Sequence, residues 1–489
     1  MTSGATLYGL AFPPYDRAWA AWIALVPLLL AVRGRSGVEA FCCGLAYGVV
    51  CSATVAGWLV ATMVSFFGLS PLLGRLVAAL YGLVFWGAAF GVFAAGAARL
   101  LGSRRPTIAA VGIAALWVAT ELLRGRVLGQ PWCLLGYSQH ADVALIQLSA
   151  LTAVYGVSFL VALGNVAAAD ALVLLRTGRV RGALRPLVLP AALVATAWIA
   201  GARVVPATPV EGTLPVSIIQ TNVPPAVRWT RAYTDRQIMA HTRMTDELGP
   251  QARGGLVVWP ENAVPRYLEV EPGLVALLRS VALRHDSDLL FGVPRFDHGH
   301  TYNSVRLVTA AGRNGGHYDK QRLVLFAEAN PLRPAGQSGP GENPTRFSAG
   351  HDPGVLRGTI PVGVSVCHEV LFPDLAARAV AAGAQLLVNV SNDGWLDPAT
   401  GVASRQHAAM AVFRAVETRR HLARAATTGI SAVVDPYGRV VAALAPDEPG
   451  VLHARVDGRT GLTPYARLGD VFALGCLLVA AAALAWLRR

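Results

Sequence analysis

The stretch Val362-Gly363-Val364-Ser365-Val366-Cys367-His368-Glu369 decides the fold of the middle of this 489-residue chain. Its β-branched run predicts a buried strand, and three polar residues follow where that strand ends. The stretches Val257-Val258-Trp259-Pro260-Glu261 and Tyr318-Asp319-Lys320 have the same form. Each therefore places a reactive side chain (a thiol, a carboxylate or an ammonium group) at a strand end, where loops build active sites.

Short apolar runs like these recur from Leu214 onwards and alternate with helical patterns. The predicted strands are Val216–Gln220, Leu256–Trp259, Leu289–Val293, Ser304–Val308, Val362–Val366, Leu386–Val390 and Ser431–Val434. The clearest helical pattern covers Ala403–Ala425. This alternation predicts an α/β domain whose sheets are covered by helices. The stretch Asn330–Gly354 is rich in proline and glycine and is longer than an ordinary connection, so we expect it to be a lid or a substrate-entry loop.

The flanking parts of the chain have the composition of a membrane protein. Hydrophobic residues make up 54% of the sequence and charged residues 15%, and the mean hydropathy is +0.47. A short apolar segment at Leu7–Phe12 is a doubtful additional span and lacks the features of a cleavable signal peptide. The predicted spans are Ala18–Val32, Ala40–Met63, Leu76–Ala98, Thr107–Leu123, Val157–Leu175, Pro186–Ala202 and Val471–Leu487.

The arginines at the ends of these spans predict their orientation. One side of the membrane collects Arg33, Arg35, Arg99, Arg104, Arg105, Arg176, Arg179, Arg181, Arg185, Arg488 and Arg489, against Arg17, Arg75, Arg124, Arg126 and Arg203 on the other. Because the richer side is cytoplasmic, the middle domain is expected to face outwards, where no ATP is available. The net charge of +13 lies in short clusters without interleaved aromatic residues, which argues against a nucleic-acid partner.

Cysteine 367 is the only cysteine of the middle domain, so no disulfide framework is expected. A thiol, a carboxylate and an ammonium group suffice for acyl transfer, as nucleophile, proton carrier and oxyanion donor. Taken singly, each has an ordinary explanation: Cys367 as a small core residue, Glu261 and Lys320 as surface charges. His368 is a poor base for Cys367 because neighbours on a strand point to opposite sides. A zinc site lacks clustered ligands at metal spacing.

Together, in this order and spacing, the three stretches resemble the Glu-Lys-Cys triad of the nitrilase (carbon-nitrogen hydrolase) superfamily and, more narrowly, its membrane branch, the apolipoprotein N-acyltransferase family. The resemblance continues through further motifs: Gln220–Pro224, Trp259–Pro265, Asn389–Trp395, Gln406-His407, Arg414–Glu417, Thr428–Ala432, and in the membrane part Glu121–Gly125, Gln130–Trp132 and Gly136–Gln139. It implies an α/β nitrilase-like αββα sandwich inserted between transmembrane α-helices. The implied domains are a helix bundle over residues 1–205, a catalytic domain over 206–460 and a final transmembrane helix over 461–489.

The resemblance also assigns roles to individual residues. Glu261 would be the general base and acid, Lys320 the oxyanion donor and Cys367 the nucleophile. Supporting carboxylates and substrate-binding tryptophans would be Glu328, Glu369, Trp229 and Trp395. No cofactor or metal is implied.

The sequence departs from the family pattern at four positions near these residues. They are His368 after the nucleophile, Leu325 and Ala327 before Glu328, and Thr427 in the turn before Thr428. Because the triad itself is intact, these changes bear on substrate preference and loop conformation.

The implied reaction moves an acyl chain from a phospholipid, through a cysteine thioester, to the N-terminal amine of diacylglyceryl-cysteine apolipoproteins. The enzyme would act as a monomer in the bacterial inner membrane. One alternative is a membrane-tethered amidase or esterase in which water resolves the thioester. Another is a transporter or scaffold with an inert outer domain, for which the intramembrane residues Asn165 and Asp170 could be cited.

Overall fold

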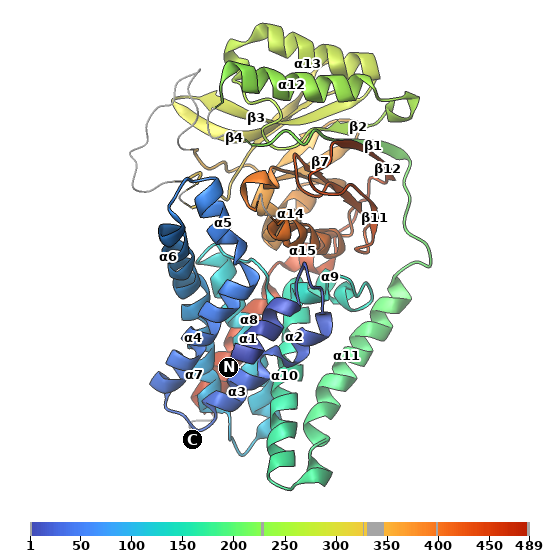
Figure 1. The fold of residues 1–489 in the computed structure, drawn as a ribbon. Helices are drawn as coiled ribbons and strands as arrows, with labels where there is room; N and C mark the ends of the chain where they lie inside the picture. Colours follow the sequence, from blue (N-terminus) through green and yellow to red (C-terminus); the bar gives the residue numbers. More distant parts are fainter. Residues whose placement is uncertain (1, 226–228, 326, 330–346, 398–399, 487–489) are drawn as a thin grey trace. The chain divides into compact units, whose positions relative to one another are not determined.

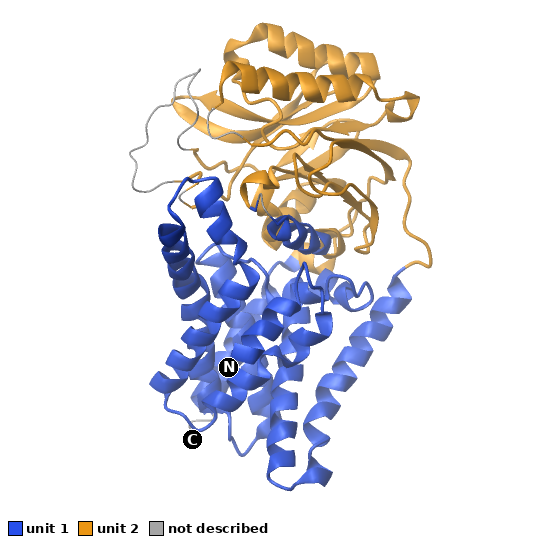
Figure 2. Ribbon diagram, in the orientation of Figure 1, with its two compact units in different colours: residues 1–205, 397–413, 468–489 blue, residues 206–396, 414–467 orange. Residues whose placement is uncertain are grey.

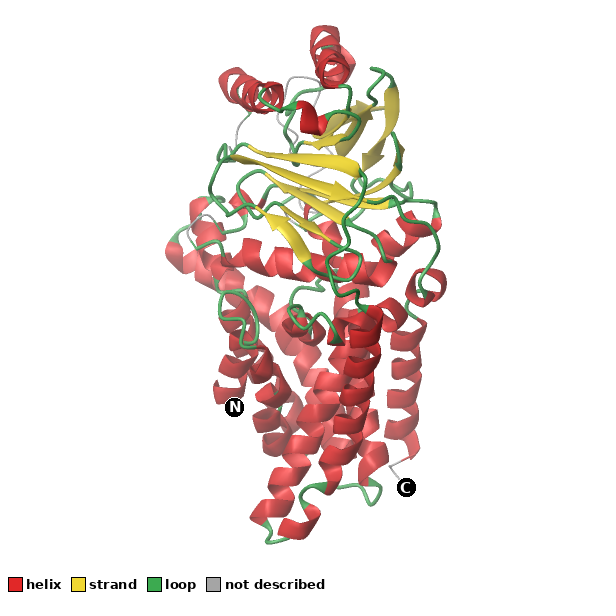
Figure 3. Cartoon of the chain, turned by 90° about the vertical axis from the view of Figure 1, so that its right-hand side faces the viewer, coloured by secondary structure: helices red, strands yellow, loops and turns green. Residues whose placement is uncertain are grey.

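The computed structural model describes residues 2–225, 229–325, 327–329, 347–397 and 400–486. They form two compact units (Figure 2): unit 1 comprises residues 1–205, 397–413 and 468–489, and unit 2 comprises 206–396 and 414–467. Within the described residues, all the strands lie in unit 2 and the regular structure of unit 1 is helical. Figure 3 shows the helices in red and the strands in yellow. The three-part domain division expected from the sequence stays a prediction.

Unit 1 is a bundle of apolar helices. Five stretches among the described residues are long and apolar enough to cross a membrane: Gly37–Val55, Pro71–Leu100, Pro106–Arg126, Val154–Arg176 and Val180–Val204. Two shorter apolar stretches, Ala18–Val32 and Val471–Trp486, accompany them. The helices are α1 (Thr2–Leu10), α2 (Ala18–Ala24), α3 (Val26–Val32), α4 (Gly37–Val55), α5 (Trp58–Ser65), α6 (Pro71–Tyr81), the π-helix η1 (Gly82–Gly87), α7 (Ala88–Leu100), α8 (Pro106–Arg126), α9 (Ser149–Thr152), α10 (Val154–Arg176), α11 (Arg185–Val204) and α17 (Val471–Trp486).

One predicted span is divided in the structure. The apolar run Ala40–Met63 is interrupted at Ala56 and Gly57, so α4 ends at Val55 and a separate helix α5 follows. Hydrophobicity alone did not reveal this break, because the residues on both sides of it are apolar.

Small residues let the helices of unit 1 approach closely. Gly44 of α4 faces α7, where an added Cβ would lie 2.3 Å from the Phe90 carbonyl oxygen. An added Cβ on Gly48 would likewise lie 2.7 Å from the Trp86 carbonyl oxygen. Backbone contact at small residues therefore packs this bundle.

The polar residues that could be cited for a transporter have partners within the bundle. Asn165 donates to the Ala21 carbonyl oxygen, and Asp170 pairs with Arg33.

Unit 2 is an αββα sandwich, as the family resemblance implied, and among the described residues each of its two sheets has six strands. The first sheet has the order β12-β1-β2-β3-β4-β5 and the second β11-β10-β9-β8-β7-β6. The strands are β1 (Leu214–Gln220), β2 (Leu256–Val258), β3 (Asp288–Asp297), β4 (His300–Val308), β5 (Asn314–Asp319), β6 (Val355–Arg357), β7 (Pro361–Val366), β8 (Leu386–Ser391), β9 (Leu422–Ala426), β10 (Ala432–Val434), β11 (Val440–Ala443) and β12 (Gly450–Val456). The main helices of unit 2 are α12 (Arg231–Asp246), α13 (Pro272–His285), α14 (Pro373–Ala381) and α16 (Pro464–Leu468), of which α12 and α13 lie together on the first sheet (Figure 1). Helix α15 (Val402–Thr418) is divided between the units, with residues 402–413 in unit 1 and 414–418 in unit 2.

The sequences of the central strands are continuously apolar because both faces of these strands are buried, each in a different core. In β2, Leu256 and Val258 point into the core between the two sheets, whereas Val257 points into the core under the helices. Strand β3 divides in the same way, with Leu290 facing the other sheet and Leu289 facing the helices. Strands β1, β2 and β3 are parallel, as are β7, β8 and β9, so their carboxyl ends form a common edge in each sheet.

Helix α15 is shorter than the helix that the sequence predicts. The helix predicted over Ala403–Ala425 is wrong at its end: α15 stops at Thr418, Arg419 has a φ of 55°, and residues Leu422–Ala426 form strand β9. An alanine-rich run fits a helix by propensity, but tertiary pairing with β8 and β10 overrides it. Of the predicted lid Asn330–Gly354, residues 330–346 lie outside the described residues.

We expect Gly44→Val to destabilise unit 1 by about 1–3 kcal/mol, because the new side chain would overlap the backbone of α7. The measurement is the midpoint of thermal unfolding of the purified protein in detergent. Gly475→Val is the matched control, since nothing lies within 4 Å of a Cβ at that apolar helix position. Equal midpoints for the two variants would contradict the close packing of α4 on α7.

Candidate active site

The candidate nucleophile occupies a strained turn at the end of β7. Cys367 has a φ of 52° and is 1% exposed. It begins a short 3-10 turn, Cys367–Leu371. The left-handed region costs a residue other than glycine about 1–2 kcal/mol, so the surrounding structure must hold this conformation.

Glu369 holds this turn against the loop after β5. Its fully buried carboxylate accepts hydrogen bonds from the Val366 amide at 2.8 Å and from the Gln321 and Arg322 amides at 2.7 and 2.9 Å. The Tyr318 hydroxyl donates to the same carboxylate at 2.9 Å. Burial raises the pKa of Glu369. The carboxylate thereby connects the stretch that carries Cys367 to the stretch that carries Lys320.

Glu261 follows β2 in a loop that crosses β3 at a glycine. An added Cβ on Gly292 would lie 2.5 Å from the Asn262 nitrogen and 2.7 Å from the Glu261 Cα. The next residue, Asn262, has a φ of 55°. This close crossing brings the Glu261 side chain into the interior, where it is 4% exposed.

Glu261, Lys320 and Glu328 form one cluster, in which Glu261 and Lys320 are buried and Glu328 is half-buried. The Lys320 Nζ donates to Glu328 Oε1 at 2.7 Å and lies 3.6 Å from Glu261 Oε1. Asn303 bridges the two carboxylates, because its Nδ2 donates to Glu261 Oε1 and to Glu328 Oε1, each at 2.8 Å. The Asn392 amide donates to Glu261 Oε2 at 2.9 Å. Every oxygen of Glu261 therefore has a donor, and one ammonium group serves two carboxylates.

The charges of this cluster also act on Cys367. Burial, and then the negative charge of Glu261, raise the pKa of the Cys367 thiol, while Lys320 opposes this effect. Burial opposes the charge of Lys320, but Glu328 and Glu261 outweigh it and hold the pKa of the ammonium above its usual value. Burial raises the pKa of Glu261, and Lys320 lowers it in part. The site thus combines a thiol and a carboxyl group, both of raised pKa, with a buried ammonium group.

The structure thus brings together Glu261, Lys320 and Glu328, with Cys367 within electrostatic range and Glu369 behind the turn. Asn303 was missed by sequence reasoning, because an amide residue before a predicted strand is unremarkable there. The donor on Asn392 is a backbone group, which no residue type signals. Trp229 is half-buried in the coil before α12, and Trp395 is half-buried against the inter-sheet core, so their roles in substrate binding stay predictions.

The positions that depart from the family pattern lie around this cluster. His368 packs edge-on against Phe372, with 5.7 Å between ring centroids. Leu325 is exposed and Ala327 half-buried, whereas Thr427 is buried and its amide donates to the Ser391 carbonyl oxygen at 3.1 Å. Among the described residues, no group of three or more His, Cys, Asp or Glu side chains could hold a metal ion.

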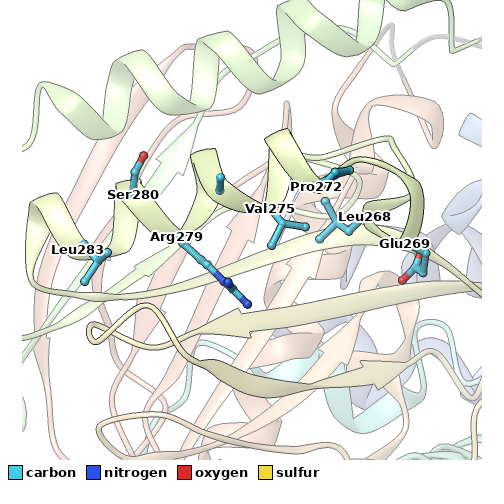
Figure 4. Close-up of a pocket in the computed structure, with 8 residues that line it drawn as sticks. Leu268, Glu269, Pro272, Val275, Arg279, Ser280 and Leu283 are labelled. Atoms are coloured by element: carbon cyan, nitrogen blue, oxygen red, sulfur yellow. The ribbon is translucent and has the colours of Figure 1, made fainter.

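A separate pocket of about 560 Å³ lies along α13. Figure 4 shows Arg279 extending from α13 towards the neighbouring strands. The lining residues are Leu268, Glu269, Pro272, Val275, Ala276, Arg279, Ser280 and Leu283. This pocket contains none of the clustered residues described above, so its size has no bearing on their chemistry.

Known proteins resemble both parts of the chain. The family model "Apolipoprotein N-acyltransferase N-terminal domain" matches residues 4–167, and the model "Carbon-nitrogen hydrolase" matches residues 216–465. An apolipoprotein N-acyltransferase of Geobacter metallireducens is 33% identical over 99% of this chain and 94% of its own length. One of Pseudomonas putida is 30% identical over 93% of this chain and 90% of its own. The crystal structure of a carbon-nitrogen hydrolase from Helicobacter pylori G27 matches at 18% identity and a TM-score of 0.40, over 50% of this chain and 89% of that one.

Glu261→Gln should not destabilise the protein at neutral pH. Since burial raises the pKa of Glu261, the folded protein holds this proton more tightly than the unfolded chain, whose glutamate pKa is about 4.3. The contribution of the Glu261 proton to the free energy of unfolding is fully present below that value and is lost as the pH rises through the pKa of Glu261 in the folded protein. We therefore expect the thermal midpoint of Glu261→Gln, relative to wild type, to increase as the pH is raised above about 4.3.

The control for this comparison is Glu247→Gln, which replaces an exposed glutamate of the same unit and should show no such trend. A relative midpoint that falls with rising pH would mean that Lys320 stabilises the Glu261 carboxylate by more than burial disfavours it.

Proposed function

Because the chain belongs to the apolipoprotein N-acyltransferase family, we propose that it takes the acyl group from a membrane phospholipid and carries it as a thioester on Cys367. The acceptor is the N-terminal amine of an apolipoprotein cysteine that already bears diacylglycerol. The chain is an acyltransferase of lipoprotein maturation; the donor, the thioester and the residue roles are the proposal.

In the first half-reaction, the Cys367 sulfur attacks the carbonyl carbon of the phospholipid ester. Glu261 takes the thiol proton, which its raised pKa favours, and the Lys320 ammonium stabilises the oxyanion. The ester C–O bond then breaks, and the leaving alkoxide receives the proton from Glu261. The products are a thioester and a lysophospholipid.

In the second half-reaction, the neutral amine of the apolipoprotein attacks the thioester carbonyl. Glu261 accepts a proton from the amine as the C–N bond forms, the C–S bond breaks, and the Cys367 thiolate recovers that proton. The result is an amide and a regenerated thiol. An ester, a thioester and an amide follow one another without a phosphorylated intermediate, so the cycle uses no nucleotide.

The observation that carries this proposal is the common burial of the reacting groups. Cys367 and Lys320 are each 1% exposed and Glu261 is 4% exposed. A site that excludes water strengthens the attraction between Lys320 and the oxyanion, and it protects a thioester from hydrolysis until an amine arrives. Burial therefore favours transfer over the amidase or esterase alternative.

The apolar helices of unit 1 supply the setting for this reaction. Both substrates are lipids or lipid-anchored, and confinement to a bilayer raises their effective concentration at the enzyme. We place the enzyme in the bacterial inner membrane as a single copy, with the residues around Cys367 on the extracytoplasmic side, as the distribution of arginines predicts.

Cys367→Ala should prevent formation of the acyl adduct, and Cys367→Ser should abolish transfer, because a hydroxyl is a far weaker nucleophile beside a carboxylate base. Intact-mass spectrometry of the purified chain, after exposure to phospholipid, detects the adduct. Cys476→Ser, a cysteine of α17, is the control and should acquire the adduct normally. An adduct on Cys367→Ala would assign the acyl group to another residue, and release of free fatty acid without lipoprotein amide would indicate a hydrolase.

Lys320→Met should slow adduct formation by on the order of 10²-fold or more, since an oxyanion donor is lost. It should also destabilise the fold, because Glu261 and Glu328 lose the ammonium group between them. The double variant Lys320→Met/Glu328→Gln removes one of the two carboxylates and should recover thermal stability without recovering activity. Recovery of both would make Lys320 a structural cation only.

A further inference from the structure

A row of three polar residues crosses the second sheet beneath the nucleophile. Ser365 of β7 pairs with Asn389 of β8, which pairs with Arg424 of β9. The residues on either side of Asn389 and Arg424, such as Val388 and Ala423, point into the inter-sheet core. Because side chains alternate along a strand, the row lies on the opposite, helix-covered face of the sheet.

Arg424 is the charged member of this row and is 1% exposed. One branch of its guanidinium donates to the Asn389 side-chain oxygen. The other branch donates to Asp393 Oδ2 at 2.5 Å, and Asp393 is itself only 1% exposed. A planar fork can satisfy two acceptors in fixed directions at once, which a lysine ammonium on a flexible stem does not reproduce.

The first branch leads to the nucleophile. With its oxygen held by Arg424, the Asn389 amide turns its Nδ2 towards β7, where it donates to the Cys367 carbonyl oxygen at 3.1 Å. The same nitrogen donates to the Ser365 carbonyl oxygen at 3.2 Å. The Cys367 backbone is in the left-handed region, so a hydrogen bond to its carbonyl helps to fix a conformation that an isolated cysteine would leave.

The second branch leads to the base. Asp393 accepts from the Ser391 hydroxyl at 2.6 Å, so the residues on both sides of Asn392 are held. Asn392 is the residue whose amide donates to Glu261 Oε2. That hydrogen bond favours the ionised carboxylate and lowers the pKa of Glu261 against the effect of burial.

We propose that Arg424 is a positioning residue that sets the Cys367 turn through Asn389 and the Glu261 carboxylate through Asp393 and the Asn392 amide. It touches neither substrate nor the reacting atoms. The inference rests on the roles proposed above for Cys367 and Glu261, and it adds that one buried guanidinium aligns the two.

The test uses the full-length chain in detergent with phospholipid vesicles, and follows acyl-adduct formation in single turnover by intact mass. Arg424→Lys should form the adduct on the order of 10²-fold more slowly at saturating phospholipid, with an unchanged half-saturating concentration. The acid limb of its pH–rate profile should move to higher pH, because Glu261 loses part of its amide donor while Lys320, Glu328 and Cys367 still face it. A residue that is merely structural would not move this limb.

The matched control is Arg420→Lys. Arg420 is also buried in unit 2, but its guanidinium donates to backbone carbonyls such as those of Ala384 and Gly461. It should leave the rate and the pH profile unchanged. If Arg424→Lys behaves like Arg420→Lys, the inference is overturned while the proposed function stands.

A second variant guards against loss of folding. Arg424→Gln/Asp393→Asn removes both charges together and leaves no unpaired ion in the interior. It should fold and show the same slow rate and displaced limb; a wild-type profile for this variant would also overturn the inference. If wild type itself forms no adduct on Cys367, the proposed function fails, and that outcome is distinct from both.

Discussion

The ammonium group of Lys320, buried between two carboxylates, is the interaction on which the rest of the site depends. A buried cation is costly unless it is paired, and two carboxylates that face each other without a cation repel. Lys320 meets both conditions, since it bonds Glu328 and lies close to Glu261. Residues from two separate loops, the one after β2 and the one after β5, are thereby held in one place. Burial, and then the negative charge of Glu261, keep the pKa of the neighbouring Cys367 thiol above its usual value, while Lys320 opposes them.

The sandwich makes this arrangement possible. In each sheet the central strands run parallel, so their carboxyl ends lie along one common edge. The segments that follow these ends carry Glu261 and Cys367. The two six-stranded sheets repeat the same pattern of three parallel strands with antiparallel strands at the sides. The rigid interior then fixes groups that the loops alone would leave mobile, such as the Cys367 turn held through Glu369.

Hydrophobic patterns with a definite period predicted an α/β domain with helix-covered sheets, most of its central strands and the apolar helices, whereas the αββα sandwich was implied by the family resemblance. Prediction from the sequence failed where local propensity and tertiary pairing disagree. The alanines of β9 favour a helix by propensity, but this segment pairs with β8 and β10 as a strand. The break after Val55 was missed because hydrophobicity does not record backbone direction. Some residues of the site could be predicted from the sequence and others could not. Reactive side chains at strand ends stand out in the sequence, whereas the Asn303 bridge and the Asn392 amide exist only once the chain is folded.

The left-handed backbone at Cys367 places chemistry and conformational preference in conflict at a single residue. The shape of the turn suits glycine, whereas the proposed reaction needs the sulfur of a cysteine. Replacing Cys367 with glycine is therefore expected to relieve the backbone strain of the turn and, at the same time, to remove the proposed nucleophile. A screen for stability alone would therefore favour a substitution at this position that abolishes the proposed activity.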